Sequence, residues 1–286
     1  MRGLISILSL AMLLPQAVSW AQIYAPNESG VALGHWHTIV RDVEATKKFW
    51  ILLGGKPIKV DEADVIKFPG ILVFLTKGLP AGGSDGTVVN HGGLRTANGK
   101  ELMEKLAAAG VKMDPVDPAT GRPPNLPKGT RVWNFAYTPD DFRVEILEDR
   151  DSIQKNDFTV PTSSDLVHFY LPDVPSIARA QAWYAKVFAA VPTPPVPPAR
   201  DVNSLIPGAK LNFSLSRTPP LPTKGRALDH IGFEVKNLEA FCKELEASGV
   251  KFDQPYSKTR HKSFASAELT DLWGTSIELT EGLDRF

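Results

Sequence analysis

The stretch Leu33-Gly-His-Trp-His-Thr-Ile-Val-Arg-Asp42 alternates polar and apolar residues and ends on an acidic residue. The alternation predicts a β-strand, and Asp42 predicts the start of a helix directly after it. Side chains two positions apart in a strand lie on the same face. We therefore expect His35 and His37 on one face of this strand and Trp36 on the other.

The same order of a strand that begins near a histidine and a helix that follows it returns along the chain. It occurs at Asn90-His-Gly-Gly-Leu94 and Asp229-His-Ile-Gly-Phe233, with a weaker copy at Leu166-Val-His-Phe-Tyr-Leu-Pro-Asp173. Such recurrence indicates an internal repeat. Each copy is followed by further short strand patterns, so we predict four βαβββ modules and an α+β fold.

The N-terminus has the pattern of an export signal. A short basic start precedes an apolar run from Leu4 to Leu14, and small residues flank Trp20 before Gln22. The run is shorter than a membrane-spanning helix, so residues 1–21 are predicted to be a signal peptide with cleavage near Ala21. The mature protein is expected in the periplasm or outside the cell, without a membrane anchor.

The rest of the chain divides into two predicted domains of two modules each, at 30–149 and 165–282, joined by a polar linker at 150–164. The 286 residues carry 32 Lys and Arg and 32 Asp and Glu, with no basic stripe. This balance argues against nucleic-acid or membrane-surface binding as the main task. The chain is expected to be a monomer or a homodimer.

With these motifs in order, the sequence resembles the vicinal oxygen chelate superfamily, which includes glyoxalase I, bleomycin- and fosfomycin-resistance proteins and extradiol dioxygenases. The resemblance rests on His35 seven residues before Asp42, on Phe49-Trp50 followed by Gly54, on His91, and on Val-Glu-Ile around Glu145. It implies that paired modules form two open β-barrel-like domains, each with a metal cleft.

Transferred residue by residue, the resemblance implies a metal site of His35, His91 and Glu145 in the N-terminal domain. Two imidazoles and one carboxylate suit Fe(II) best, with Mn(II) or Zn(II) as alternatives. The C-terminal domain offers a poorer set of His230, Glu278 and His168, because Leu166 stands where the first histidine is expected.

The resemblance implies a metalloenzyme that binds a small substrate through two adjacent oxygens, with a dioxygenase favoured slightly over a lyase or isomerase. His37 and Tyr137 are the candidates for proton transfer. A different reading is a metal-free protein that sequesters a small molecule in an aromatic cleft. The substrate-contacting aromatic residues would be Trp36, Trp50, Phe74, Trp133 and Phe135.

Overall fold

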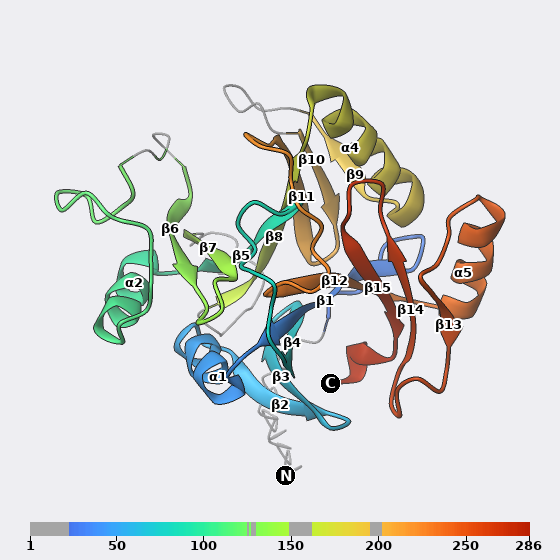
Figure 1. Cartoon of the computed structure of the whole chain (residues 1–286), viewed down its shortest axis with the longest axis horizontal. Coiled ribbons are helices and arrows are strands. Elements are labelled where there is room, and N and C mark those ends of the chain that lie inside the picture. Colours follow the sequence, from blue (N-terminus) through green and yellow to red (C-terminus); the bar gives the residue numbers. More distant parts are fainter. Residues whose placement is uncertain (1–22, 125, 127–129, 149–161, 195–201) are drawn as a thin grey trace, which may run out of the picture.

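The structure is a computed structural model that describes residues 23–124, 126, 130–148, 162–194 and 202–286 (Figure 1). The predicted signal peptide lies outside these residues, and so does most of the predicted linker. The end of the linker, 162–164, belongs to a strand instead. No helix among the described residues is long and apolar enough to cross a membrane.

One sheet has eight strands, four from each end of the chain. The N-terminal strands are β1 (Val31–Val40), β2 (Lys56–Val60), β3 (Ala63–Phe68) and β4 (Ile71–Lys77). The C-terminal strands are β12 (Leu228–Val235), β13 (Gln254–Ser257), β14 (Ala265–Thr270) and β15 (Ser276–Glu281). Their order is β13-β14-β15-β12-β1-β4-β3-β2, and the two groups meet where β1 pairs antiparallel with β12.

The other sheet has seven strands from the middle of the chain, in the order β6-β7-β5-β8-β11-β10-β9. These strands are β5 (Val89–Thr96), β6 (Val132–Tyr137), β7 (Arg143–Glu148), β8 (Thr162–Leu171), β9 (Val191–Thr193), β10 (Val202–Ile206) and β11 (Ala209–Leu215). Here the groups meet where β5 pairs antiparallel with β8. Both sheets are open, so the predicted α+β fold with open sheets is confirmed.

The predicted pairing of the modules is wrong. The first module joins the fourth in one sheet, and the second joins the third in the other, so the described strands do not divide into domains at 30–149 and 165–282. The starting strands of the modules share one sequence pattern. Their sequence therefore does not determine which two modules meet.

The helices α1 (Val43–Leu52), α2 (Gly99–Ala108), α4 (Val174–Phe188) and α5 (Leu238–Ala247) lie on the outside of the sheets (Figure 1). A short 3-10 helix, η1 (Leu283–Arg285), follows the last strand. Asp42, Asn98 and Asp173 cap the starts of α1, α2 and α4 by accepting a hydrogen bond from a backbone N–H three residues on. Such caps fix where the helices begin after the strands.

β-Bulges set the direction of the side chains at the two strand junctions. In the β1–β12 pair, Leu33 faces Phe233 and His35 faces Gly232, so Gly34 is an extra residue. The β5–β8 pair has an extra residue at Asp165 in the same position. The extra residue of a bulge shifts the alternation of side chains along its strand, so that residues before and after it change faces. Leu33 and Trp36 consequently both point to the main core, and His35 and His37 point away from it.

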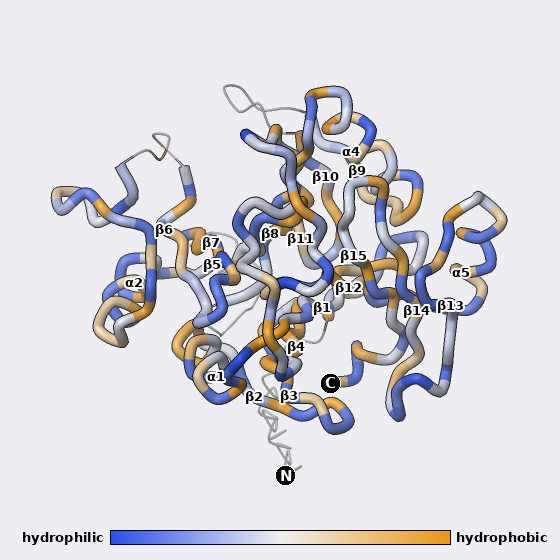
Figure 2. Tube along the Cα trace, viewed as in Figure 1, coloured by the Kyte–Doolittle hydropathy of each residue, from blue (hydrophilic) through white to orange (hydrophobic). Residues whose placement is uncertain are grey.

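The main core lies between the sheets and the helices, and it draws residues from all modules. Its largest members near β1 are Trp36, Trp50 and Phe142, whose rings lie 5.6–6.2 Å apart. Figure 2 shows hydrophobic segments in the central strands and hydrophilic segments in the outer loops. The core therefore holds β1 rigidly from one face and leaves its histidine face for other contacts.

Candidate metal centres

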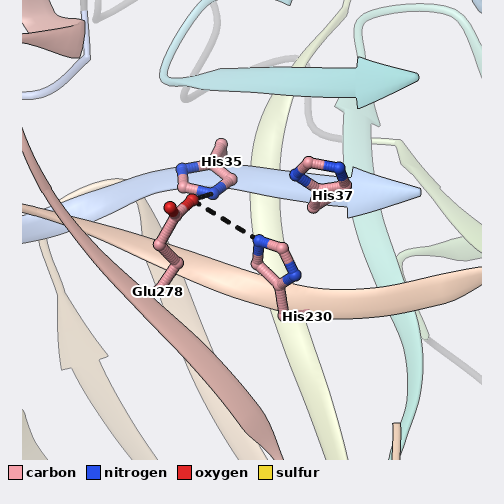
Figure 3. Close-up of side chains that lie close together, drawn as sticks. All are labelled: His35, His37, His230 and Glu278. Atoms are coloured by element: carbon pink, nitrogen blue, oxygen red, sulfur yellow. Dashed lines mark ion pairs between the residues drawn. The ribbon is translucent and has the colours of Figure 1, made fainter. Parts of the chain in front are cut away.

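The first candidate centre, site A, consists of His35 and His37 from β1, His230 from β12 and Glu278 from β15 (Figure 3). Each residue offers a ligand atom, and these atoms lie within 4.8 Å of one another. The antiparallel register places His37 opposite His230, and the parallel β12–β15 register places Glu278 beside Gly232. Residues from opposite ends of the chain thus converge on one point.

The ligand atoms of site A are as close to one another as atoms that bind one common ion. Glu278 Oε2 lies 3.0 Å from His35 Nε2 and 3.5 Å from His230 Nε2. His35 is fully buried, yet neither of its ring nitrogens has a hydrogen bond of acceptable direction. Buried polar atoms are nearly always satisfied. The orphaned nitrogens at the centre of the cluster indicate that the site is built for a further group.

Two neighbours hold the rings of site A. Asp229, the extra residue of a second bulge in the β1–β12 pair, accepts from Nδ1 of His230 at 2.7 Å. Thr76 Oγ1 lies 2.7 Å from Nε2 of His37. Histidine ligands usually have their second ring nitrogen fixed in this way.

His230 and Glu278 carry the charge in site A. Burial alone would lower the pKa of His230, but Asp229 and Glu278 raise it to about 9. Burial opposes ionisation of Glu278, yet the close contacts of its carboxylate with His230, His261 and His35 keep its pKa well below the ordinary value. Burial lowers the pKa of both His35 and His37. A negative carboxylate therefore sits among imidazoles of which two are neutral.

Site A opens into a pocket of about 410 Å³. Phe74 and Phe264 form an aromatic wall, and the ring of His261 stacks on Phe264 with 4.0 Å between centroids. His37 stacks on Phe74 at 5.6 Å. The pocket has the size and the mixed lining of a small-molecule site.

The second candidate centre, site B, consists of His91 from β5, Glu145 from β7 and His168 from β8. Nε2 of His91 lies 3.2 Å from Glu145 Oε2 and 3.1 Å from His168 Nδ1. Burial raises the pKa of Glu145 and lowers that of His91. Sites A and B are the clusters of metal-ligand type found among the described residues.

Residues 166–279 match the family model of the Glyoxalase/Bleomycin resistance protein/Dioxygenase superfamily. This segment of the chain thus carries a domain of the superfamily. The comparison with curated proteins gives no match. Among solved structures, glyoxalase I from Zea mays is similar with 18% identity and a TM-score of 0.67, over 89% of this chain and 94% of that one.

A putative dioxygenase from Bacillus subtilis subsp. subtilis str. 168 is similar with 13% identity and a TM-score of 0.62, over 92% of this chain and 86% of that one. At these identities the likeness concerns the fold. The chain thus shares the fold of these two proteins along nearly all of its length.

The metal site predicted from the superfamily resemblance is wrong in its grouping. His35 lies in site A, whereas His91 and Glu145 lie together in site B. The predicted C-terminal set is divided as well, because His230 and Glu278 join His35 while His168 joins His91. Both errors follow from the wrong pairing of modules, since each candidate centre is built by the two modules that share a sheet.

The two predicted catalytic residues, His37 and Tyr137, have different surroundings. His37 lies in site A, as a neighbour of the predicted ligand His35. Tyr137 lies in a separate pocket with Lys112, and its hydroxyl donates to Asp114 at 2.7 Å. Burial and Asp114 raise the pKa of Tyr137 to about 12. Tyr137 is therefore not placed to transfer protons at either centre.

The predicted substrate-binding aromatics are divided between pocket and core. Phe74 lines the pocket of site A. Phe135 packs against His91 of site B, with the Arg143 guanidinium 3.6 Å from its ring. Trp36 and Trp50 are fully buried in the main core, and that prediction is wrong. Trp133 is half-buried beside Gly99, under the Arg122 guanidinium.

Sequence reasoning missed several residues of the two centres. His261, which no motif singled out, has Nε2 3.6 Å from Glu278 Oε1. The hydroxyls of Thr76 and Ser214, and the side chains of Asn90 and Asp229, contact the histidines. One signal was present: an Asn or Asp directly precedes both His91 and His230.

Proposed function

We propose that the protein is a metal-dependent enzyme of the superfamily that binds a small substrate through two adjacent oxygen atoms at site A. The observation that carries the proposal is the arrangement of His35, His230 and Glu278. Their donor atoms lie 3.0 and 3.5 Å apart around unsatisfied ring nitrogens, at the floor of a pocket.

The donor set fits a divalent ion. Two ligands at about 2.1 Å from one ion and at tetrahedral or octahedral angles are themselves about 3.0–3.4 Å apart. Two imidazoles and one carboxylate leave positions open for substrate, and this set favours Fe(II), with Mn(II) or Zn(II) as alternatives. An ion held there supplies Lewis acidity or, if it is iron, oxygen activation.

The chain's own residues have distinct tasks in this proposal. His35, His230 and Glu278 hold the ion. His37 is neutral and half-buried beside it, and its ring offers a nitrogen for a substrate proton. Thr76 fixes the orientation of that ring. Phe74 and Phe264 give an apolar surface against which an aromatic or alkyl substrate would pack.

Within this class we propose a dioxygenase. The donor set supports it, as does the likeness of fold to the putative dioxygenase from B. subtilis. A lyase or isomerase would use the same ion without oxygen. The metal-free sequestering protein has less support, because Trp36 and Trp50 lie in the core and cannot stack on a ligand in the pocket.

The test is anaerobic loading with Fe(II), followed by oxygen-uptake measurements with a panel of catechols, α-hydroxycarbonyl compounds and epoxides. The proposal predicts oxygen uptake with at least one chelating substrate, and its loss in Glu278→Gln. Turnover without oxygen uptake would replace the dioxygenase by a lyase or isomerase. Substrate binding that persists without any metal would contradict the enzyme proposal.

We also propose that the protein acts outside the cytoplasm after removal of residues 1–21. Expression of the full chain in a bacterium, with mass spectrometry of the periplasmic fraction, should find a mature N-terminus near Gln22. A full-length chain retained in the cytoplasm would contradict this.

A further inference from the structure

We propose that the connection between β13 and β14, residues 258–264, is a gate over the pocket of site A, and that Asp61 is the positioning residue that holds this gate closed. Both the gate and Asp61 line the pocket. The closure is a property of the two loops alone. Its use in the entry of a substrate rests on the proposed function at site A.

The two loops belong to hairpins at opposite ends of the eight-stranded sheet. The β2–β3 turn consists of Asp61 and Glu62 alone, whereas the gate is a longer connection without regular structure. Although β2 and β13 are the two edge strands of the sheet, the gate reaches the turn of the other hairpin (Figure 1). The two loops therefore bridge the mouth of the pocket that both of them line.

Asp61 makes the closest contact between the two loops. Its Oδ2 accepts from the backbone N–H of Lys262 at 3.0 Å and from that of Ser263 at 3.3 Å, and its Oδ1 accepts from the Ser263 hydroxyl at 2.6 Å. The bond from this hydroxyl is the main reason that the pKa of Asp61 lies below its usual value. The carboxylate is therefore ionised at neutral pH, and hydrogen bonds to an ionised acceptor are the stronger kind.

The two ends of the gate are fixed by other contacts. Arg260 donates to the backbone and side chain of its own hairpin, and Phe264 is buried in a small core below the pocket. Between these two anchors, the hydrogen bonds of Lys262 and Ser263 within the described part of the chain all go to the β2–β3 turn. Loss of the contact with Asp61 would thus free the middle of the gate and leave its ends in place.

The closed gate places His261 over site A. Its Nε2 is buried and lies 3.6 Å from Glu278 Oε1, and its ring stacks on Phe264 with 4.0 Å between the centroids. His261 directly precedes the two residues that Asp61 holds. Opening at Asp61 would therefore withdraw the imidazole from Glu278 and widen the mouth of the pocket.

Glu62 offers a matched control, because it contacts the same loop in a weaker way. Its carboxylate lies 3.1 Å from Lys262 Nζ, and both side chains are largely exposed. Exposed ion pairs of this kind contribute little to stability. Of two neighbouring carboxylates that contact the gate, only Asp61 should therefore determine whether it is closed.

The test is limited digestion of the metal-free full chain with trypsin, because the gate contains Lys258, Arg260 and Lys262 as cleavage sites. Asp61→Gly removes the carboxylate and suits the backbone, since φ of this residue is 50°. We expect cleavage within 258–264 to become about tenfold faster or more than in the wild type. Glu62→Gln should be cleaved at the rate of the wild type.

Ser263→Ala keeps Asp61 and removes one of its hydrogen bonds, so cleavage should become about two- to fivefold faster. This variant also serves if Asp61→Gly does not fold, and an unchanged rate in it would then overturn the proposal. Equal rates in Asp61→Gly and the wild type, or equal acceleration by Asp61→Gly and Glu62→Gln, would overturn it as well.

Zinc exchange distinguishes a gate from a residue that supports the ligands. In a Glu145→Gln background, which removes the carboxylate of site B, stopped-flow measurements with a chelating dye give the rates at site A. A gate changes association and dissociation by the same factor, so Asp61→Gly should accelerate both about tenfold and leave the Kd unchanged. A weaker Kd without faster association would show a supporting role and overturn the gate. If no variant binds zinc at site A while the trypsin result is as expected, the proposed function fails and the gate stands.

Discussion

Leu166 lies against Gly93 in one sheet as His35 lies against Gly232 in the other. A Cβ on Gly232 would be 1.9 Å from the His35 ring, and one on Gly93 would be 2.5 Å from Leu166 Cγ. The glycine on the partner strand therefore makes room for the facing side chain in both sites. Site A has an imidazole in this space, and site B has an apolar side chain.

Replacing Leu166 by His should turn site B into a copy of site A. The new imidazole would occupy the space above Gly93 and add a ligand to His91, Glu145 and His168. We expect zinc affinity at site B to rise by about tenfold or more, measured by competition with a chelating dye in the Glu278→Gln background. The same substitution without any change in affinity would show that the two sites are not built alike.

Asp229 and Asn90 should affect different centres. Asp229→Ala removes the support of His230, so affinity at site A should fall about 10–100-fold while site B is unchanged. Asn90→Ala is the matched variant and should have the opposite effect. Isothermal titration with zinc in Glu145→Gln and Glu278→Gln backgrounds measures each site alone. Equal effects of both variants on both sites would contradict the independence of the centres.

Glu234 should make the stability of the fold depend on pH. It is buried on β12 and accepts hydrogen bonds from Thr280 and from the backbone of Gly282 and Leu283. Burial outweighs these bonds and raises the pKa of Glu234. The folded state thus binds this proton more tightly than the unfolded state, and this contribution to stability is lost as pH rises through the raised pKa.

Glu234→Gln keeps an oxygen for the two backbone donors and removes the titration. Relative to the wild type, its free energy of unfolding should improve as pH rises from about 4 to about 7. Urea denaturation across this range measures the difference. If the difference in free energy of unfolding between Glu234→Gln and the wild type stays constant with pH, the raised pKa of Glu234 is contradicted.

Trp36 should contribute to the stability of the fold and not to metal binding. It is fully buried and packs against Trp50 and Phe142 on the face of β1 opposite the histidines. Trp36→Phe should lower the free energy of unfolding by about 1–3 kcal/mol and leave zinc stoichiometry unchanged. Phe74→Leu is the contrasting variant, because Phe74 lines the pocket and contacts His35 and His37. Loss of zinc from Trp36→Phe at unchanged stability would place the indole in the site.

The pattern around His35 was sufficient to predict the fold class, because alternation, helix caps and repetition are local properties of the chain. The ligand residues were predicted from the resemblance to the superfamily, and His35, His91, His230 and Glu278 each lie in one of the two candidate centres. Their grouping was not predictable. It depends on β1 pairing with β12 and not with β5, and these strands have equivalent patterns.

The supporting residues were harder to infer for a different reason. Thr76 and Ser214 contact histidines 39 and 46 residues away, through parallel strand registers that the sequence does not specify. His261 reaches Glu278 from the β13–β14 connection, where no periodic pattern exists. Trp36 and Trp50 are aromatic residues of the kind that also line ligand clefts. Only the packing in the structure shows that they belong to the core.

The most direct test of the metal centre at site A is anomalous diffraction from crystals of the protein loaded with Co(II). We predict a peak about 2.0–2.2 Å from His35 Nε2, His230 Nε2 and an oxygen of Glu278. If crystals kept in a cobalt solution give an anomalous map without a peak among these three side chains, the metal centre at site A is contradicted.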